Sequence, residues 1–137
     1  MHALLKPGGQ LFIREGHPVI WSMEGADGPS GDCLKTIYPY FEVKDPNVFD
    51  EGGTYVQLES EGHVFKTTKT HEWNHGLGEI VQSLLDVGML ITGLVEHRSV
   101  PWEPFPGMMR SIGNGEFELK EGRDLVPLTY TLKAVKK

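Results

Sequence analysis

The stretch HEWNHGLGEIVQSLLDVG, residues 71–88, carries two conflicting signals. Its first five residues match H-E-x-x-H, in which two histidines four residues apart on a helix bind zinc and the glutamate activates a metal-bound water. The residues that follow have apolar side chains at helical spacing: Leu77, Ile80, Val81, Leu84 and Leu85. The position of His71 and His75 relative to that helix therefore decides which fold and which chemistry the stretch supports.

The flanking residues favour a helix that begins after both histidines. Residues 66–70, KTTKT, are rich in β-branched threonine, and the glycines downstream are poor helix-interior residues. We expect a helix over 77–87, with Gly76 near its N-cap, Glu79 accepting from free backbone N–H groups of the first turn, and Gly88 as the stop signal. Both histidines then lie outside the helix, and no metal site is expected.

The remaining apolar segments predict strands on either side of that helix. The run QLFIR at 10–14 is short and mostly apolar, as is typical of a strand buried on both faces in a parallel sheet. A second strand is expected over 90–97. A last strand is expected over 128–134, where apolar and polar side chains alternate as in a half-covered antiparallel strand. The fold class is therefore α/β.

Two other regions are rich in glycine and proline. In residues 19–70, β-type segments recur between turn signals, which indicates a β-rich insertion. Its expected β segments are 38–43, 54–58 and 63–70. The second region, 101–122, is predicted to be a loop.

Composition and charge exclude several classes of function. The chain has 137 residues, which suits one domain, and a formal net charge of -6. Its lysines and arginines form no basic stripe, so nucleic acid is not an expected partner. No apolar run approaches the roughly 20 residues of a membrane helix, so we expect no membrane partner and a cytoplasmic location. Cys33 is the only cysteine, which precludes an internal disulfide.

Several short stretches resemble class I S-adenosylmethionine-dependent methyltransferases. LKPGGQLFIRE, residues 5–15, is similar to the place where a helix ends and the fifth sheet strand of that family begins. One branch, which acts on small molecules, has further stretches similar to this chain. They are Trp73-Asn74-His75 before Leu77-Gly78-Glu79-Ile80, then Val87-Gly88, Glu96-His97 and the closing PLTYTLKAVKK.

The resemblance implies the C-terminal half of a doubly wound sheet, with an antiparallel last strand and a β-rich insertion. Residues 1–137 would form a single partial domain: a helix end and buried strand in 1–18, the insertion in 19–70, and a helix with two terminal strands in 71–137. The family's cofactor is S-adenosylmethionine, held by an Asp/Glu-x-Gly-x-Gly loop that this sequence does not contain. We therefore expect no tight binding of that cofactor to this chain alone, and its cofactor-binding residues are unassigned.

The carboxyl end of the first predicted strand suggests a catalytic region. Ligands of open α/β sheets bind beyond the carboxyl ends of the strands. Glu15 and His17 follow the strand at 10–14, so they are candidates to orient or deprotonate a methyl acceptor. The alternative is that both are surface groups at a strand end.

Aromatic residues at loop junctions suggest an acceptor pocket. Trp73, His75 and Trp102 are the candidates for substrate binding, and the wider set that could line an apolar site adds Trp21, Tyr38, Tyr40, Phe41 and Phe105. Each could instead be a packing anchor.

The function expected from the resemblance is part of a methyltransferase for a small molecule, catalytically incomplete alone. Its expected partners are a small-molecule acceptor and either further copies of the chain or the missing N-terminal half. Two alternatives stay open. One is a non-catalytic β-rich binding or assembly module. The other is a zinc hydrolase using HEWNH, which would need a third ligand such as His63 or His97.

Overall fold

The fold is described by a computed structural model in which residues 2–24, 33–50 and 67–137 are placed. The predicted segment 54–58, the first half of the segment 63–70, and the candidate ligand His63 lie outside these residues. The described helices are η1 (His2–Leu4), α1 (Pro18–Trp21) and α2 (Leu77–Asp86). The described strands are β1 (Gln10–Gly16), β2 (Met23–Glu24), β3 (Lys35–Thr36), β4 (Asn47–Asp50), β5 (Lys69–Glu72), β6 (Met89–His97), β7 (Met109–Gly113), β8 (Glu116–Leu119) and β9 (Thr129–Lys136).

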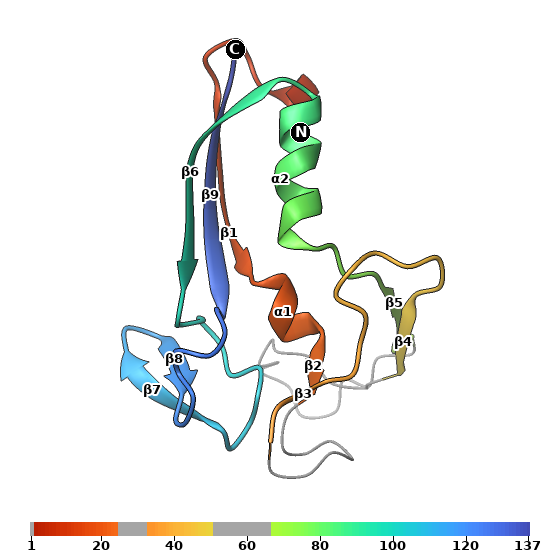
Figure 1. The fold of residues 1–137 in the computed structure, drawn as a ribbon, viewed down its shortest axis with the longest axis vertical. Helices are drawn as coiled ribbons and strands as arrows, with labels where there is room; N and C mark the ends of the chain where they lie inside the picture. Colours follow the sequence, from red (N-terminus) through yellow and green to blue (C-terminus); the bar gives the residue numbers. More distant parts are fainter. Residues whose placement is uncertain (1, 25–32, 51–66) are drawn as a thin grey trace.

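A three-stranded sheet with the order β1-β9-β6 forms the upper part of the molecule (Figure 1). The last strand, β9, is antiparallel to both neighbours, so β1 and β6 run in the same direction on either side of it. The predicted alternation holds over residues 130–134, where Tyr130, Leu132 and Ala134 are buried and Lys133 is exposed, but Thr129 on the polar side of the pattern is buried as well. Alternate side chains of a strand point to opposite faces, so one face of β9 forms the core.

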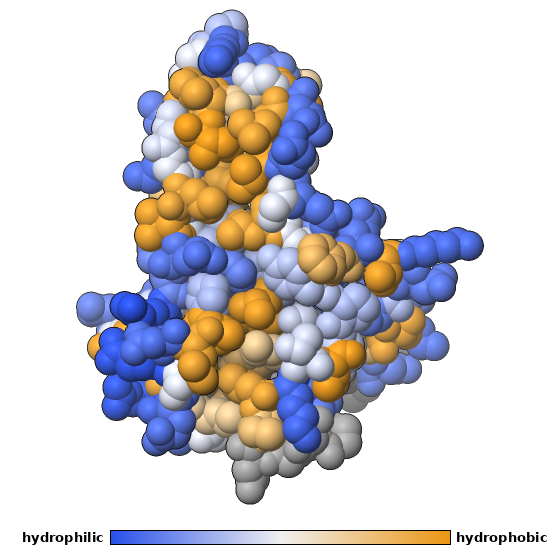
Figure 2. Space-filling model, viewed as in Figure 1, coloured by the Kyte–Doolittle hydropathy of each residue, from blue (hydrophilic) through white to orange (hydrophobic). Residues whose placement is uncertain are grey.

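The helix α2 covers that buried face. Leu84 of α2 packs in one cluster with Tyr130, Leu132 and Ala134 of β9, and Leu11 and Ile13 of β1 join from the neighbouring strand. Figure 2 shows hydrophobic side chains gathered in the upper part of the molecule, where α2 lies beside the sheet. The amphipathic period read from the sequence is therefore what attaches the helix to the sheet.

The start of α2 lies where the sequence predicted it. Gly76 is the N-cap, and its backbone N–H donates to Glu79 Oε2 at 2.9 Å. The helix ends at Asp86, and Gly88 follows with φ 79°. His71 lies in β5 and His75 precedes the N-cap, so the two histidines do not share a helical face.

The prediction that β1 is buried on both faces is wrong. Phe12 is 63% exposed, and Arg14 is also exposed, while Leu11 and Ile13 point toward α2. The reason is that β1 pairs only with β9, and within the described ranges α2 covers a single face of the sheet. A mostly apolar run thus stands at an edge of the sheet.

A second core forms the lower part of the molecule, and it corrects the loop predicted over 101–122. That region contains the hairpin β7–β8, whose turn has positive φ at Asn114 and Gly115, 53° and 74°. Asn-Gly is the typical pair for such a turn. Phe105, Met109 and Leu119 are buried here together with Ile20, Val100 and Leu128.

The insertion also differs from its prediction in detail. The segment 38–43 has no strand, although short strand pairs flank it: β2 with β3, and β4 with β5. Pro39 lacks the N–H that a ladder needs, and its carbonyl accepts from the side chain of Asn74 at 3.3 Å. The Tyr40 hydroxyl accepts from the Leu77 N–H at 3.1 Å. The segment therefore packs against the start of α2 instead of extending a sheet.

Candidate functional site

A cavity of about 890 Å³ lies between α1, the β4–β5 pair and the segment after β6. Three tryptophans contribute to its lining: Trp21 from α1, Trp73 from the residues before α2, and Trp102. The other lining residues are Ile20, Met23, Tyr38, Asn47, Phe49, Thr68, Thr70, Glu72, Asn74, Pro104 and Phe105. A largely apolar wall with a few polar groups is the usual composition of a small-molecule site.

The indole rings are exposed to an unusual degree for their size. Trp21 is 48% exposed, Trp73 47% and Trp102 36%. Trp21 and Trp102 stack on each other, with ring centroids 5.9 Å apart and planes within 15°. Tryptophan is highly buried on average, so three partly exposed indoles around one cavity offer apolar surface that a ligand could cover.

Close packing against the sheet fixes the position of Trp21. A Cβ built on Gly16, at the end of β1, would lie 2.8 Å from the Trp21 ring. Any larger residue at this position would have to displace the indole ring. Glycine at the end of β1 thus leaves the space that the Trp21 ring occupies in the wall of the site.

Asn74 ties the wall that carries Trp73 to two other segments. Its side-chain amide donates to the Pro18 carbonyl at 2.8 Å and to the Pro39 carbonyl at 3.3 Å. Gly76 then passes so close to Tyr40 that an added Cβ would lie 2.9 Å from that ring. These contacts hold the extended residues between β5 and α2, and they explain why the stretch does not continue the helix toward its N-terminus.

Glu72 is the charged side chain among the described residues that line the cavity. Its Oε1 accepts from the Thr70 hydroxyl at 3.0 Å. The other polar lining groups are neutral amides and hydroxyls. The wall therefore combines aromatic faces with a negative charge.

The predicted substrate-binding residues divide into two groups. Trp73 and Trp102, far apart in the sequence, both line the cavity. His75 does not line it; its Nδ1 lies 3.7 Å from Glu42 Oε2 on the surface. Their roles in binding stay predictions, but the structure brings the two tryptophans to one place.

The predicted catalytic residues do not line the cavity. His17 is the N-cap of α1 and is 5% exposed. Its Nδ1 accepts from the Val19 N–H at 3.1 Å, so the ring proton is on Nε2. Nε2 lies 2.9 Å from Glu96 Oε1, within ion-pair distance but poorly aligned for a hydrogen bond.

Burial lowers the pKa of His17, and the Glu96 carboxylate offsets part of that shift. Because Nδ1 already accepts a backbone hydrogen bond, the imidazole has no free lone pair with which to take a proton from a ligand. Glu15 is exposed on the edge strand β1, opposite Tyr130 of β9. Nothing in these contacts assigns Glu15 a catalytic role.

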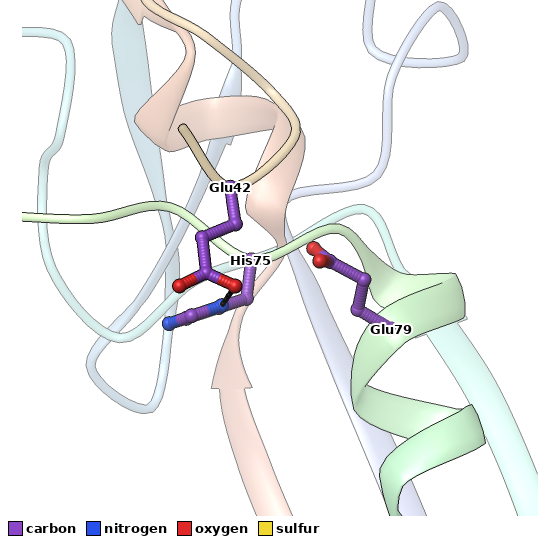
Figure 3. A group of neighbouring side chains, drawn as sticks. All are labelled: Glu42, His75 and Glu79. Carbon is purple, nitrogen blue, oxygen red and sulfur yellow. Dashed lines mark ion pairs between the residues drawn. The ribbon is translucent and has the colours of Figure 1, made fainter. Parts of the chain in front are cut away.

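One histidine of HEWNH takes part in a different group of side chains at the start of α2. Ligand atoms of Glu42, His75 and Glu79 all lie within 4.8 Å of one another (Figure 3). Imidazole and carboxylate can hold a divalent cation. All three side chains are exposed, however, and one carboxylate oxygen of Glu79 already caps the helix. A surface ion pair and a helix cap are sufficient to explain the group.

A second cavity, of about 550 Å³, lies beside the β7–β8 hairpin and is mostly polar. Its charged side chains already have partners. Arg98 pairs with Asp124 at 2.6 Å, and Glu118 pairs with Arg110 at 2.5 Å and with Arg123 at 3.8 Å. The tryptophan-lined cavity is therefore the better candidate for a ligand.

Sequence reasoning missed part of this cavity. Phe49 lies in no motif, whereas Glu72 is the glutamate of HEWNH and Asn74 belongs to the stretch Trp73-Asn74-His75, but neither was considered as a lining residue. Each of the three is a polar or aromatic residue near the end of a short strand, which is only a weak sequence signal for a binding site. Of the wider aromatic set, Trp21, Tyr38 and Phe105 line the cavity, whereas Tyr40 and Phe41 do not.

Comparisons with known proteins give one finding of similarity. No protein-family model matches the chain, and no curated protein matches it significantly. A solved structure from Listeria monocytogenes, provisionally assigned as an S-adenosylmethionine-dependent methyltransferase, is similar, with a TM-score of 0.54 and 17% sequence identity. The match covers 99% of this chain and 51% of that one, so this chain spans about half the length of its structural neighbour. The chain thus has a methyltransferase-like fold.

Proposed function

We propose that the chain is the C-terminal portion of an S-adenosylmethionine-dependent methyltransferase that acts on a small molecule. The observation that carries the proposal is the structural likeness, which extends over 99% of this chain but half of its neighbour. The sheet order β1-β9-β6 with an antiparallel last strand agrees with one half of a larger doubly wound sheet. The tryptophan-lined cavity supplies a place for the methyl acceptor.

Two of the described glycines, Gly9 and Gly16, leave no room for a methyl donor beside them. Donor-binding glycines allow the backbone to approach the ligand closely. At Gly9 an added Cβ would meet the Lys6 carbonyl at 2.7 Å, and at Gly16 it would meet Trp21 at 2.8 Å. Both close approaches are thus filled by the chain's own atoms. The proposal assigns donor binding to the other half of the enzyme.

In this proposal the chain contributes by positioning. Holding two reactants in line can supply a large part of the barrier reduction for a displacement reaction. Trp21, Trp73 and Trp102 would fix the plane of the acceptor and exclude water from it. A general base is not assigned, because His17 and Glu15 do not line the cavity.

The free side of β1 supports pairing with the other half. Among the described residues, β1 pairs with β9 alone, which leaves the N–H and C=O groups of its outer side open to another strand. Phe12 is 63% exposed on the face that α2 does not cover. A partner strand beside β1 would cover this surface. Self-association through the same edge is the alternative.

The test is to co-express the chain with the polypeptide encoded immediately upstream and to measure co-purification, binding of S-adenosylmethionine and methyl transfer. We expect donor binding for the complex and none for the chain alone. Phe12→Asp should weaken association, because it buries a charge in the contact. Leu85→Asp is the matched control, since Leu85 is 46% exposed on α2, which covers the opposite face of the sheet. Absence of donor binding by the co-expressed pair would refute the proposal.

The two alternatives fare differently. A zinc hydrolase loses its structural basis because α2 begins at Leu77, after both histidines of the motif. A non-catalytic assembly module remains a second candidate, favoured by the open edge of β1. Sedimentation of the chain alone distinguishes it: a stable homodimer that Phe12→Asp dissociates, with no methyl transfer by the co-expressed pair, would favour assembly.

A further inference from the structure

We infer that the tryptophan-lined cavity recognises a flat aromatic molecule that carries a positive charge, such as a protonated arylalkylamine. The inference rests on the proposed function in taking this cavity as the acceptor site. It concerns recognition of the ligand only. Three features of the wall carry it: the indole faces, the charge, and the hydrogen-bonding groups.

The first feature is the shape and polarity of the aromatic surface. Trp21 and Trp102 stack on each other with planes within 15°, so each ring has only its outer face left for a ligand, and both line the cavity together with Trp73. A planar ring stacks well on such surfaces. The face of an aromatic ring is negative, and indole attracts cations more strongly than phenyl or phenol. The three partly exposed indoles therefore favour a flat ligand with a cationic group.

The second feature is the sign of the charge. The lining includes Glu72 but, among the described residues, neither lysine nor arginine. The Thr70 hydroxyl donates to Oε1 of this carboxylate at 3.0 Å, which orients it without neutralising it. The whole chain has a formal net charge of -6, which raises the local concentration of cations over anions. An anionic ligand would meet no lysine or arginine among the described residues of this wall.

The third feature is the type of hydrogen-bonding group that Asn74 presents. Its amide nitrogen already donates to the carbonyls of Pro18 and Pro39. What it can offer a ligand is its carbonyl oxygen, which is an acceptor. Glu72 is also an acceptor. These two lining residues are thus suited to a ligand that donates N–H groups.

The experiment is a set of titrations of the chain with three probes of similar size, followed by tryptophan fluorescence and calorimetry. The probes are 2-phenylethylamine, 3-phenylpropionate and 3-phenylpropionamide, which are cationic, anionic and neutral at pH 7. We expect the amine to bind at least about tenfold more tightly than the carboxylate, and its affinity to fall as salt is added. Equal affinities for amine and carboxylate, or no amine binding at millimolar concentrations, would overturn the inference.

Variants separate the charge from the aromatic surface. Glu72→Gln should reduce amine binding about fivefold and leave the neutral amide unchanged. Glu121→Gln is the control, because it removes the same charge from an exposed residue that does not line the cavity. Trp102→Phe should weaken the amine and the amide alike. If Glu72→Gln binds the amine as the parent protein does, the charge argument fails.

These results are independent of the test of methyl transfer. The probes are measured on the chain alone, without a donor or a second half. Amine selectivity together with no methyl transfer by the co-expressed pair would leave the ligand class standing and refute the proposed function. Methyl transfer by the co-expressed pair without amine selectivity would support the proposed function and refute the ligand class.

Discussion

Replacing Asn74 tests whether the wall of the cavity is held by one side chain. The Asn74 amide donates to the Pro18 carbonyl at 2.8 Å, in a partly buried position, and to the Pro39 carbonyl at 3.3 Å, nearer the surface. A neutral hydrogen bond contributes about 0.5–1.5 kcal/mol to stability, and a long exposed one contributes least. Asn74→Ala should therefore lower the free energy of unfolding by about 1–2 kcal/mol.

Urea unfolding followed by circular dichroism measures that loss, which corresponds to a fall in the melting temperature of about 3–8 °C. Trp73 is the next residue, so its emission should shift to longer wavelength when the connection loosens. Asn74→Asp should be more destabilising than alanine at pH 7, because a carboxylate would face two carbonyl oxygens.

Gln82→Ala is the matched control. The Gln82 amide donates to Asp86 at 2.6 Å within α2, but this bond is exposed and local. Its loss should cost less than about 0.5 kcal/mol. If Asn74→Ala and Gln82→Ala destabilise the protein equally, Asn74 does not hold the cavity wall and the description of the site is wrong.

Two further predictions concern packing and acid stability. Gly16→Ala should lower the free energy of unfolding by about 1–3 kcal/mol and alter the tryptophan emission, because the new Cβ would lie 2.8 Å from the Trp21 ring. Gly78→Ala is the control: nothing lies within 4 Å of its added Cβ, so it should stabilise α2 by about 0.5–1 kcal/mol. If urea unfolding shows a gain in stability for both variants, the packing argument is wrong. The hydrogen bond from Arg110 holds the pKa of Glu118 below its usual value. This pair therefore stabilises the folded state at pH values above the unfolded pKa of about 4.3. The stabilisation is lost as the pH falls through the folded pKa. Urea midpoints of Glu118→Gln should accordingly depend less on pH in this acidic range than those of the parent protein, and parallel profiles would show that the pair contributes nothing.

The elements that the sequence predicted well are those whose signal is local. Helix α2 follows from the spacing of its apolar residues, from Gly76 and Glu79 at its start, and from Gly88 at its end. The alternation in β9 predicts its buried face in the same way. These signals depend only on residues within one or two helical turns, or within a few residues of a strand. They can therefore be recognised without knowing which segments pack against the helix or strand.

The failures come from contacts between distant segments. The run in β1 looks like a strand buried on both faces, yet its exposure is decided by how many strands and helices lie beside it. The hairpin β7–β8 contains Asn114-Gly115, a turn signal that the surrounding glycines and prolines obscured. Tyr40 lies in a β-type segment but uses its hydroxyl to bind the start of α2.

The candidate site shows the same division. The sequence by itself selected Trp73 and Trp102 because each aromatic residue lies at a loop junction, and it placed His75 outside a helix from backbone preference alone. Only the tertiary structure decided that the two tryptophans share a cavity with Glu72, and that His17 lies apart from it as a helix cap. The physical reason is that local periodicity fixes the conformation of a segment, whereas packing between segments distant in the chain fixes which side chains meet.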